Sequence, residues 1–235
     1  MRLRELSEAL QVSDSTIRRD LEHLEAQGLL TRTYGGAVLA EGEAGAALGE
    51  RIPASPLPER AEKIGAAAAA LVAQGETVYL GAGDLAMAVA HKLAARTGVT
   101  VITNALDIAA YLAHHSTLSV ILTGGQLDRQ EGALVGHVAE LALQELRADR
   151  AILDVAGISV PDGFTGESLS SASLMRTVID RMPEVIVVAD DHKWGRIGPA
   201  FLAPLEAIDR IVTSQYAPPA MIWDLSQLGI QIIQT

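Results

Sequence analysis

The chain contains no cysteine among its 235 residues. It therefore has no disulfide bond, no thiol nucleophile and no zinc–thiolate site. Aromatic residues are scarce at 3%, so alanine, valine, leucine and isoleucine have to build the hydrophobic core. No segment approaches the roughly 18 uncharged apolar residues of a membrane-spanning helix, and the first residues lack the apolar core of a signal peptide. These absences predict a cytoplasmic protein without a membrane partner.

Residues 13–36, SDSTIRRDLEHLEAQGLLTRTYGG, have the pattern of a capped amphipathic helix followed by a strand. Ser13 is a typical helix N-cap, and Gly28 is typical of the position just after a helix. At about 100° per residue, the apolar face holds Ile17, Leu21 and Leu24, and the polar face holds Ser15, Arg18, Arg19 and Glu22. Short side chains beside two adjacent guanidiniums suit a helix that enters the DNA major groove.

The residues after Gly28 predict a two-stranded hairpin. Residues 29–34 form the first strand, Gly35-Gly36 the turn, and residues 37–39 the returning strand. A helix followed by such a hairpin is the arrangement of a winged helix-turn-helix. Short amphipathic helices joined by tight turns also occur in many helical bundles, so the periodicity alone leaves DNA binding open.

The segment TIRRDLEHLEAQGLLTRTYGGA closely resembles the recognition helix and wing of the DeoR family of bacterial transcriptional regulators. The match includes the Thr-Ile-Arg-Arg-Asp-Leu run, the Gly-Leu-Leu that follows the helix and the Gly-Gly-Ala of the wing. The resemblance implies operator DNA as a partner, with Arg18 and Arg19 contacting base edges or phosphates. Supporting contacts are expected from Ser15 and Thr16, and contacts with the DNA backbone from Arg32 and Tyr34.

The net charge of −11 argues against strong binding of a single copy to DNA. Residues 1–36 contain five arginines against six acidic residues, so even this segment is close to neutral. DNA affinity depends on cations placed against phosphates, and few are present here. We therefore expect a homodimer or homotetramer, which places two DNA-binding domains (the reading heads) on the two half-sites of an operator.

The predicted DNA-binding domain, residues 1–39, begins with a short helix at residues 2–10. Proteins of the DeoR family normally carry one more helix before this point. We therefore expect a winged helix-turn-helix that lacks its first helix, either because the true start lies upstream or because the headpiece is incomplete.

Residues 40–58 contain three glycines and three prolines without a regular period, which predicts an interdomain linker. From residue 59 onward, apolar runs such as TVYL, VTVIT and EVIVVAD alternate with amphipathic helical segments. This alternation predicts an α/β effector-binding domain at residues 59–235, with a mainly parallel sheet that is covered on both faces. Ligand-binding loops are expected at the carboxyl ends of its strands.

The first such loop, Gly81-Ala82-Gly83-Asp84-Leu85-Ala86, formally fits the dinucleotide fingerprint G-x-G-x-x-G/A. That fingerprint needs an acid at the end of the next strand, where this chain has Asn104. A nicotinamide or flavin site is therefore disfavoured, and no cofactor is predicted. The more general expectation is that backbone N–H groups of this loop and the following helix N-terminus receive an anion.

Three further loops carry polar or glycine residues, namely Thr103-Asn104, Gly124-Gly125 and Asp190-Asp191-His192-Lys193. Taken singly, each loop is explained as a turn or as a solvent-exposed segment that follows a strand. Together, on successive strands of one sheet, they are expected to converge on one small polar ligand.

The resemblance to DeoR regulators continues through this half, whose fold in that family is similar to ribose-5-phosphate isomerase and glucosamine-phosphate deaminase. It implies a phosphorylated sugar as effector, with its phosphate on the Gly81 and Gly83 loop and with Lys193 and Arg51 as cations. It also implies that Asn104 and Asp190 bond sugar hydroxyls, and that Gly124 and Gly125 belong to the site.

The family's first loop is usually Ser-Gly-Thr-Thr, whereas this chain has Ala82-Gly83-Asp84-Leu85. A carboxylate and a leucine thus replace two hydroxyls, and Asp84 repels a phosphate dianion unless a cation neutralises it. The effector is therefore either a sugar phosphate or a related neutral sugar, polyol or differently placed anion.

Two functions follow from the sequence. The first is a transcriptional regulator, in particular a repressor of a carbohydrate catabolic operon that an effector releases or modulates. The second is a sugar-phosphate isomerase or deaminase with a vestigial headpiece, for which Asp84 and Asp190 are available as proton-abstracting bases. The recognition-helix pattern favours the regulator, so no catalytic residue is assigned. No metal site is predicted either, because the helical histidines His91, His114 and His115 lack a second ligand at metal spacing.

Overall fold

The computed structural model describes residues 30–33, 36–39 and 57–235. The chain divides into two compact units, residues 1–51 and residues 52–235. The predicted recognition helix and most of the linker lie outside the described residues. The same holds for the following predicted site residues, whose contacts stay predictions: Ser15, Thr16, Arg18, Arg19, Tyr34 and Arg51.

Strands β1 (Leu30–Thr33) and β2 (Gly36–Leu39) form an antiparallel hairpin at the predicted wing. Leu30 pairs with Leu39, and Thr33 pairs with Gly36. The second strand therefore begins at Gly36, one residue earlier than the sequence predicted, because Gly36 already pairs across the hairpin. Arg32 lies within β1, opposite Ala37.

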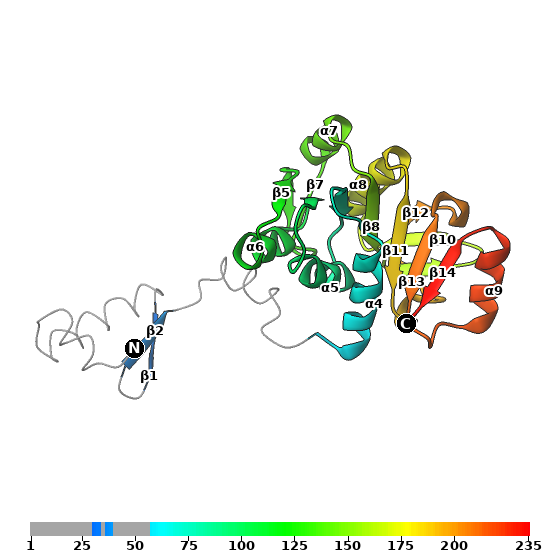
Figure 1. Ribbon diagram of the computed structural model, residues 1–235, viewed down its shortest axis with the longest axis horizontal. Helices are drawn as coiled ribbons and strands as arrows, with labels where there is room; N and C mark the ends of the chain where they lie inside the picture. Colours follow the sequence, from blue (N-terminus) through cyan, green and yellow to red (C-terminus); the bar gives the residue numbers. More distant parts are fainter. Residues whose placement is uncertain (1–29, 34–35, 40–56) are drawn as a thin grey trace, which may run out of the picture. The chain divides into compact units, whose positions relative to one another are not determined.

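Seven parallel strands form the sheet of the second unit, in the spatial order β14-β13-β11-β8-β3-β4-β5 (Figure 1). The bounds in chain order are β3 (Thr77–Leu80), β4 (Thr100–Thr103), β5 (Ser119–Leu122), β8 (Arg150–Asp154), β11 (Val185–Ala189), β13 (Arg210–Thr213) and β14 (Gln231–Gln234). Every pair of neighbouring strands in it runs parallel. The central strands consist mainly of aliphatic residues because both of their faces are buried. The predicted mainly parallel α/β domain is confirmed.

Helices cover both faces of this sheet, as expected (Figure 1). Along β3, Val78 and Leu80 enter the core under α4, α5 and α6, whereas Tyr79 enters the core under α7, α8 and α9. None of the helices in the described part of the chain is long and apolar enough to cross a membrane. Their bounds are α4 (Glu59–Ala70), α5 (Asp84–Leu93), α6 (Leu106–His115), α7 (His137–Glu145), α8 (Leu169–Arg181) and α9 (Pro219–Gln227).

The alanine-rich helix α4 packs directly against the backbone of α5. A Cβ atom added to Gly65 would lie 2.6 Å from the carbonyl carbon of Ala88, so no larger residue fits at this crossing. Ala61 and Ala68 of α4 are buried on the same side. The small residues of α4 therefore allow a close helix–helix approach that larger side chains would prevent.

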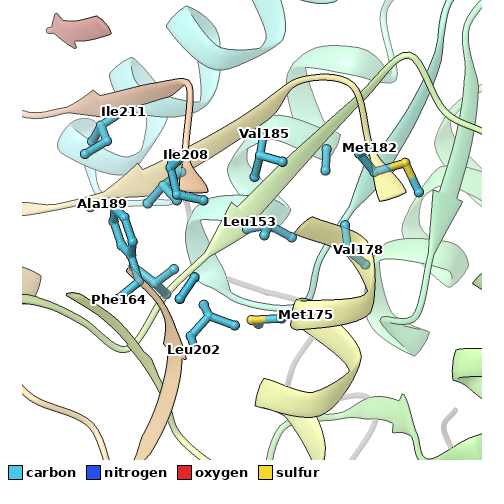
Figure 2. Close-up of a cluster of buried hydrophobic side chains, with 14 of the residues drawn as sticks. Leu153, Phe164, Met175, Val178, Met182, Val185, Ala189, Leu202, Ile208 and Ile211 are labelled. Carbon is cyan, nitrogen blue, oxygen red and sulfur yellow. The ribbon is translucent and has the colours of Figure 1, made fainter. Parts of the chain in front are cut away.

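Two antiparallel elements that the sequence did not predict are added to the parallel sheet. One is a three-stranded sheet in the order β12-β10-β9, and the other is the two-stranded ribbon β6–β7. Figure 2 shows Phe164 of β10 and Leu202 of β12 in one buried cluster with Leu153 of β8 and Met175 of α8. The bounds are β6 (Gln126–Asp128), β7 (Ala133–Val135), β9 (Gly157–Ser159), β10 (Gly163–Gly166) and β12 (Ala200–Ala203), with 3-10 helices η1 (Asp191–Lys193) and η2 (Leu205–Ala207). The small antiparallel sheet thus shares the main core and is not a separate module.

Candidate functional site

The spatial order of the parallel strands reverses between β3 and β8. From β3 the chain adds β4 and β5 on one side, and it later places β8, β11, β13 and β14 on the other. Directly after β3, the Gly81 N–H donates a hydrogen bond to the carbonyl of Ile152 within β8 (3.0 Å). In open parallel sheets, ligands bind outside the carboxyl ends of the strands at such a reversal. The predicted glycine loop after β3 lies at this point.

An ion pair with a buried carboxylate occupies the reversal point. Asp154, the last residue of β8, is 8% exposed, and its Oδ1 contacts the ammonium group of Lys193. Its other oxygen, Oδ2, accepts a hydrogen bond from the backbone N–H of Leu85 (3.0 Å). Leu85 lies in the first turn of α5 and Lys193 ends η1, so three segments meet at this carboxylate. Lys193 was predicted as a site residue, but Asp154 was not.

Burial raises the pKa of the Asp154 carboxyl, whereas the Lys193 ammonium and the Leu85 N–H act against that rise. The nearby carboxylate of Asp84 raises the pKa of Asp154 further. Both oxygens of Asp154 accept hydrogen bonds, which is the arrangement of an ionised carboxylate. Lys193 is therefore the cation that offsets part of the cost of burying this carboxylate.

Gly83, the residue that precedes α5, leaves room for the Asp154 carboxylate. A Cβ atom added to Gly83 would lie 2.3 Å from Oδ2 of Asp154, which is closer than real Cβ contacts allow. Its φ of 132° also lies in the region that favours glycine. Residue 83 therefore has to be glycine, because any larger residue would clash with the Asp154 carboxylate.

Asn104, which follows β4, has both ends of its side-chain amide bonded to protein groups. Its Oδ1 accepts from the Tyr79 hydroxyl (2.9 Å), and its Nδ2 donates to the Leu134 carbonyl (3.1 Å). The residue is 3% exposed. These bonds hold the β6–β7 ribbon against the end of β4, and the expected bond to a sugar hydroxyl stays a prediction.

Gly124 and Gly125 follow β5 at the same edge of the sheet. A Cβ atom on Gly125 would lie 2.8 Å from the Val135 carbonyl oxygen, so this glycine is required by packing on β7. A Cβ atom on Gly124 would meet nothing within 4 Å. Gly124 is therefore the member of the pair that borders open space.

The segment after β11 begins with Asp190, whose Oδ1 accepts a hydrogen bond from the His192 N–H (3.1 Å). The next residue, Asp191, pairs with Arg60 of α4, and the Arg60 guanidinium lies 4.9 Å from the centroid of the Tyr216 ring. The structure thus brings the following predicted site residues to the carboxyl edge of one sheet: Gly81, Gly83, Asp84, Asn104, Gly124, Gly125, Asp190 and Lys193.

Two family models match this chain. Residues 1–43 match the DeoR-like helix-turn-helix domain, and residues 58–215 match the DeoR C terminal sensor domain. The chain belongs to the DeoR family. It is a DNA-binding transcriptional regulator with a sensor domain, as the sequence predicted. Because this family consists of transcriptional regulators, the assignment favours the regulator over the enzyme alternative.

Curated relatives match nearly the full length of this DeoR-family chain. The uncharacterized HTH-type transcriptional regulator YulB of Bacillus subtilis (strain 168) is 31% identical over 233 residues, which are 99% of this chain and 89% of YulB. The transcriptional repressor AccR of Agrobacterium fabrum is 36% identical over 215 residues, covering 88% of this chain and 81% of AccR. The glycerol-3-phosphate regulon repressor of Escherichia coli (strain K12) is 28% identical over 228 residues, covering 97% and 90%.

Solved structures resemble the chain at low sequence identity. A mutant of RipA superposes with a TM-score of 0.50 at 15% identity, covering 75% of this chain and 54% of RipA. That likeness concerns the fold alone. A ribose 5-phosphate isomerase from Methanocaldococcus jannaschii has a TM-score of 0.43 at 18% identity, covering 57% of this chain and 53% of the isomerase.

Replacing Gly83 with alanine should lower the free energy of unfolding of the DeoR-family chain by about 3 kcal/mol, because the methyl group both strains the backbone and strikes the Asp154 carboxylate. Urea denaturation of the full chain measures this change. The matched control is Gly136→Ala, since Gly136 also precedes a helix with a positive φ of 85° but has nothing within 4 Å of an added Cβ. The control should lower the free energy of unfolding by about 1 kcal/mol. Equal losses in the two variants would show that the methyl group at residue 83 does not clash with Asp154.

Proposed function

We propose that this DeoR-family chain is a repressor of a carbohydrate catabolic operon, released from its operator by a small sugar-derived effector. The charged site at the strand reversal of the sensor domain, with Asp154 held by Lys193 beside the glycine loop, is the observation that carries the proposal. The relatives AccR and the glycerol-3-phosphate regulon repressor support the repressor role.

The proposed effector is a sugar phosphate or a related sugar or polyol, bound outside the carboxyl ends of the parallel strands. Carboxylates there accept hydrogen bonds from hydroxyl groups, and Lys193 donates them. Asp84 and Asp190 lie at this edge with Lys193, and Arg51 is proposed as a further cation. Gly124 adds a backbone position that borders open space.

Release from the operator is proposed to follow from linkage between the two domains. An effector that binds more tightly to one arrangement of the reading heads shifts the population toward it, and the operator fits only the other. Such a switch requires two heads, so we propose a homodimer or homotetramer. A regulator that binds operator DNA acts in the cytoplasm.

The Arg19→Ala variant should bind the operator about 10- to 100-fold more weakly than the wild type, because each reading head loses a base or phosphate contact. Fluorescence anisotropy with DNA from the region upstream of the gene measures the dissociation constant at several salt concentrations.

The matched control is Arg147→Ala, which removes one exposed arginine from the sensor domain, where its guanidinium bonds only neighbouring carbonyl groups of the described chain. Its operator affinity should stay within about twofold of the wild type. Unchanged affinity of Arg19→Ala, in a chain that still binds the operator, would remove the recognition-helix assignment.

A further inference from the structure

We propose that Asp154 is an internal substitute for a ligand phosphate, and that this sensor therefore selects an uncharged polyhydroxylated effector over its phosphate ester. The inference rests on the proposed function and deepens it, because it names the chemical class of the effector. The carboxylate occupies the position at the start of α5 where an external anion would otherwise bind.

The first turn of α5 offers backbone N–H groups and the positive end of a helix dipole, which together attract an anion. The Leu85 N–H of that turn already donates to Oδ2 of Asp154 (3.0 Å). The carboxylate comes from β8, a different strand, and is held in place by the body of the sheet. The anion at this helix start is therefore a fixed part of the protein.

The fit between Asp154 and Gly83 leaves no room for a second anion between them. A single carbon atom added at Gly83 would already lie 2.3 Å from Oδ2 and 2.7 Å from Cγ of Asp154. A phosphate that used the Leu85 N–H would have to displace the carboxylate from Leu85 and Lys193. Displacement would also leave a buried carboxylate unpaired, which is strongly unfavourable.

Two cations at this edge are also paired with carboxylates of the chain. Lys193 contacts Asp154, and Arg60 contacts Asp191. The described part of the sensor domain places four acidic residues at this edge beside the basic residues Lys193 and Arg60. These acids are Asp84, Asp154, Asp190 and Asp191. Local charge therefore repels a phosphate dianion, whereas carboxylates accept hydrogen bonds from the hydroxyl groups of a neutral sugar or polyol.

The test is a matched binding panel on the full-length wild-type chain. Isothermal titration calorimetry compares pentitols, hexitols and hexoses with their terminal phosphate esters, and inorganic phosphate serves as the bare anion. We expect at least one neutral compound to bind and to release the operator, with its phosphate ester binding about tenfold or more weakly. Inorganic phosphate should neither bind nor compete.

The Asp154→Asn variant keeps the side-chain shape and removes the negative charge, so Lys193 becomes available to an anion. It should bind inorganic phosphate and the phosphate esters about tenfold more tightly than the wild type does. The matched control is Asp149→Asn, since Asp149 also accepts a backbone hydrogen bond, from Thr77 N–H (2.7 Å), but at the opposite edge of the sheet. The control should keep the wild-type preference.

The outcomes separate the inference from the function on which it rests. If a phosphate ester binds the wild type more tightly than its neutral parent and releases the operator, the proposed function stands and the role of Asp154 is overturned. If no compound of either series binds or releases the operator, the effector site itself is overturned. If Asp154→Asn does not fold, competition by inorganic phosphate against the neutral ligand on the wild type decides, and effective competition contradicts the inference.

Discussion

Replacing Lys193 with methionine should lower the free energy of unfolding by about 3–5 kcal/mol, because it leaves the buried carboxylate of Asp154 without its cation. Asp154 has a side-chain exposure of only 5%, and its remaining partner among the described residues is the backbone N–H of Leu85. Methionine has nearly the length and shape of lysine, so the change tests the charge and leaves the packing almost unaltered.

The loss is measured by urea denaturation at neutral pH, with Lys63→Met as the matched control. Lys63 forms an exposed pair with Glu59 within α4, and its replacement should leave the free energy of unfolding almost unchanged. The double variant Asp154→Asn/Lys193→Met should regain most of the stability, since no buried charge is then left alone. A loss in Lys193→Met as small as in the control would contradict a buried ion pair at this position.

Replacing Phe164 with alanine should cost about 3–5 kcal/mol, because it opens a cavity where the small antiparallel sheet meets the main core. Phe164 is fully buried and lies in one cluster with Leu153 and Leu202 (Figure 2). Its ring connects β10 to the strands of the parallel sheet.

The chain contains two phenylalanines, and the second supplies the matched control. Phe201 lies in β12, the strand paired with β10, but it is 56% exposed. Phe201→Ala should therefore change the free energy of unfolding by no more than about 0.5 kcal/mol. Thermal and urea denaturation of both variants compare them directly, and similar losses would mean that the small sheet does not share the main core.

The central strands could be predicted from the sequence because each is a short apolar run between amphipathic helices. TVYL, AILD and VIVVA have this form, and the structure places them in β3, β8 and β11. The antiparallel strands could not be predicted in the same way. Segments such as Gly157–Ser159 and Gly163–Gly166 are short and rich in glycine and polar residues, and only their pairing with one another makes them strands.

The candidate site was predicted in its residues but not in its central contact. Lys193 and the glycine loop were identified from their places after apolar strands and from the family resemblance. Asp154 carried a visible signal, because it is an acidic residue directly after the apolar run Ala-Ile-Leu. Its importance depends on partners 69 and 39 positions away, Leu85 and Lys193, which no local pattern connects.

The sequence by itself determined the family, the alternation of strands and helices, and the edge of the sheet where polar loops gather. These follow from local chemistry, since apolar runs, helix caps and the recognition-helix residues are read within a few positions of one another. Only the tertiary structure decided the order of the strands, and with it the neighbours of each loop. Because β8 returns beside β3, the Asp154 carboxylate meets the start of α5 and the Lys193 ammonium, and a loop expected to receive a ligand's anion already holds one of the protein's own.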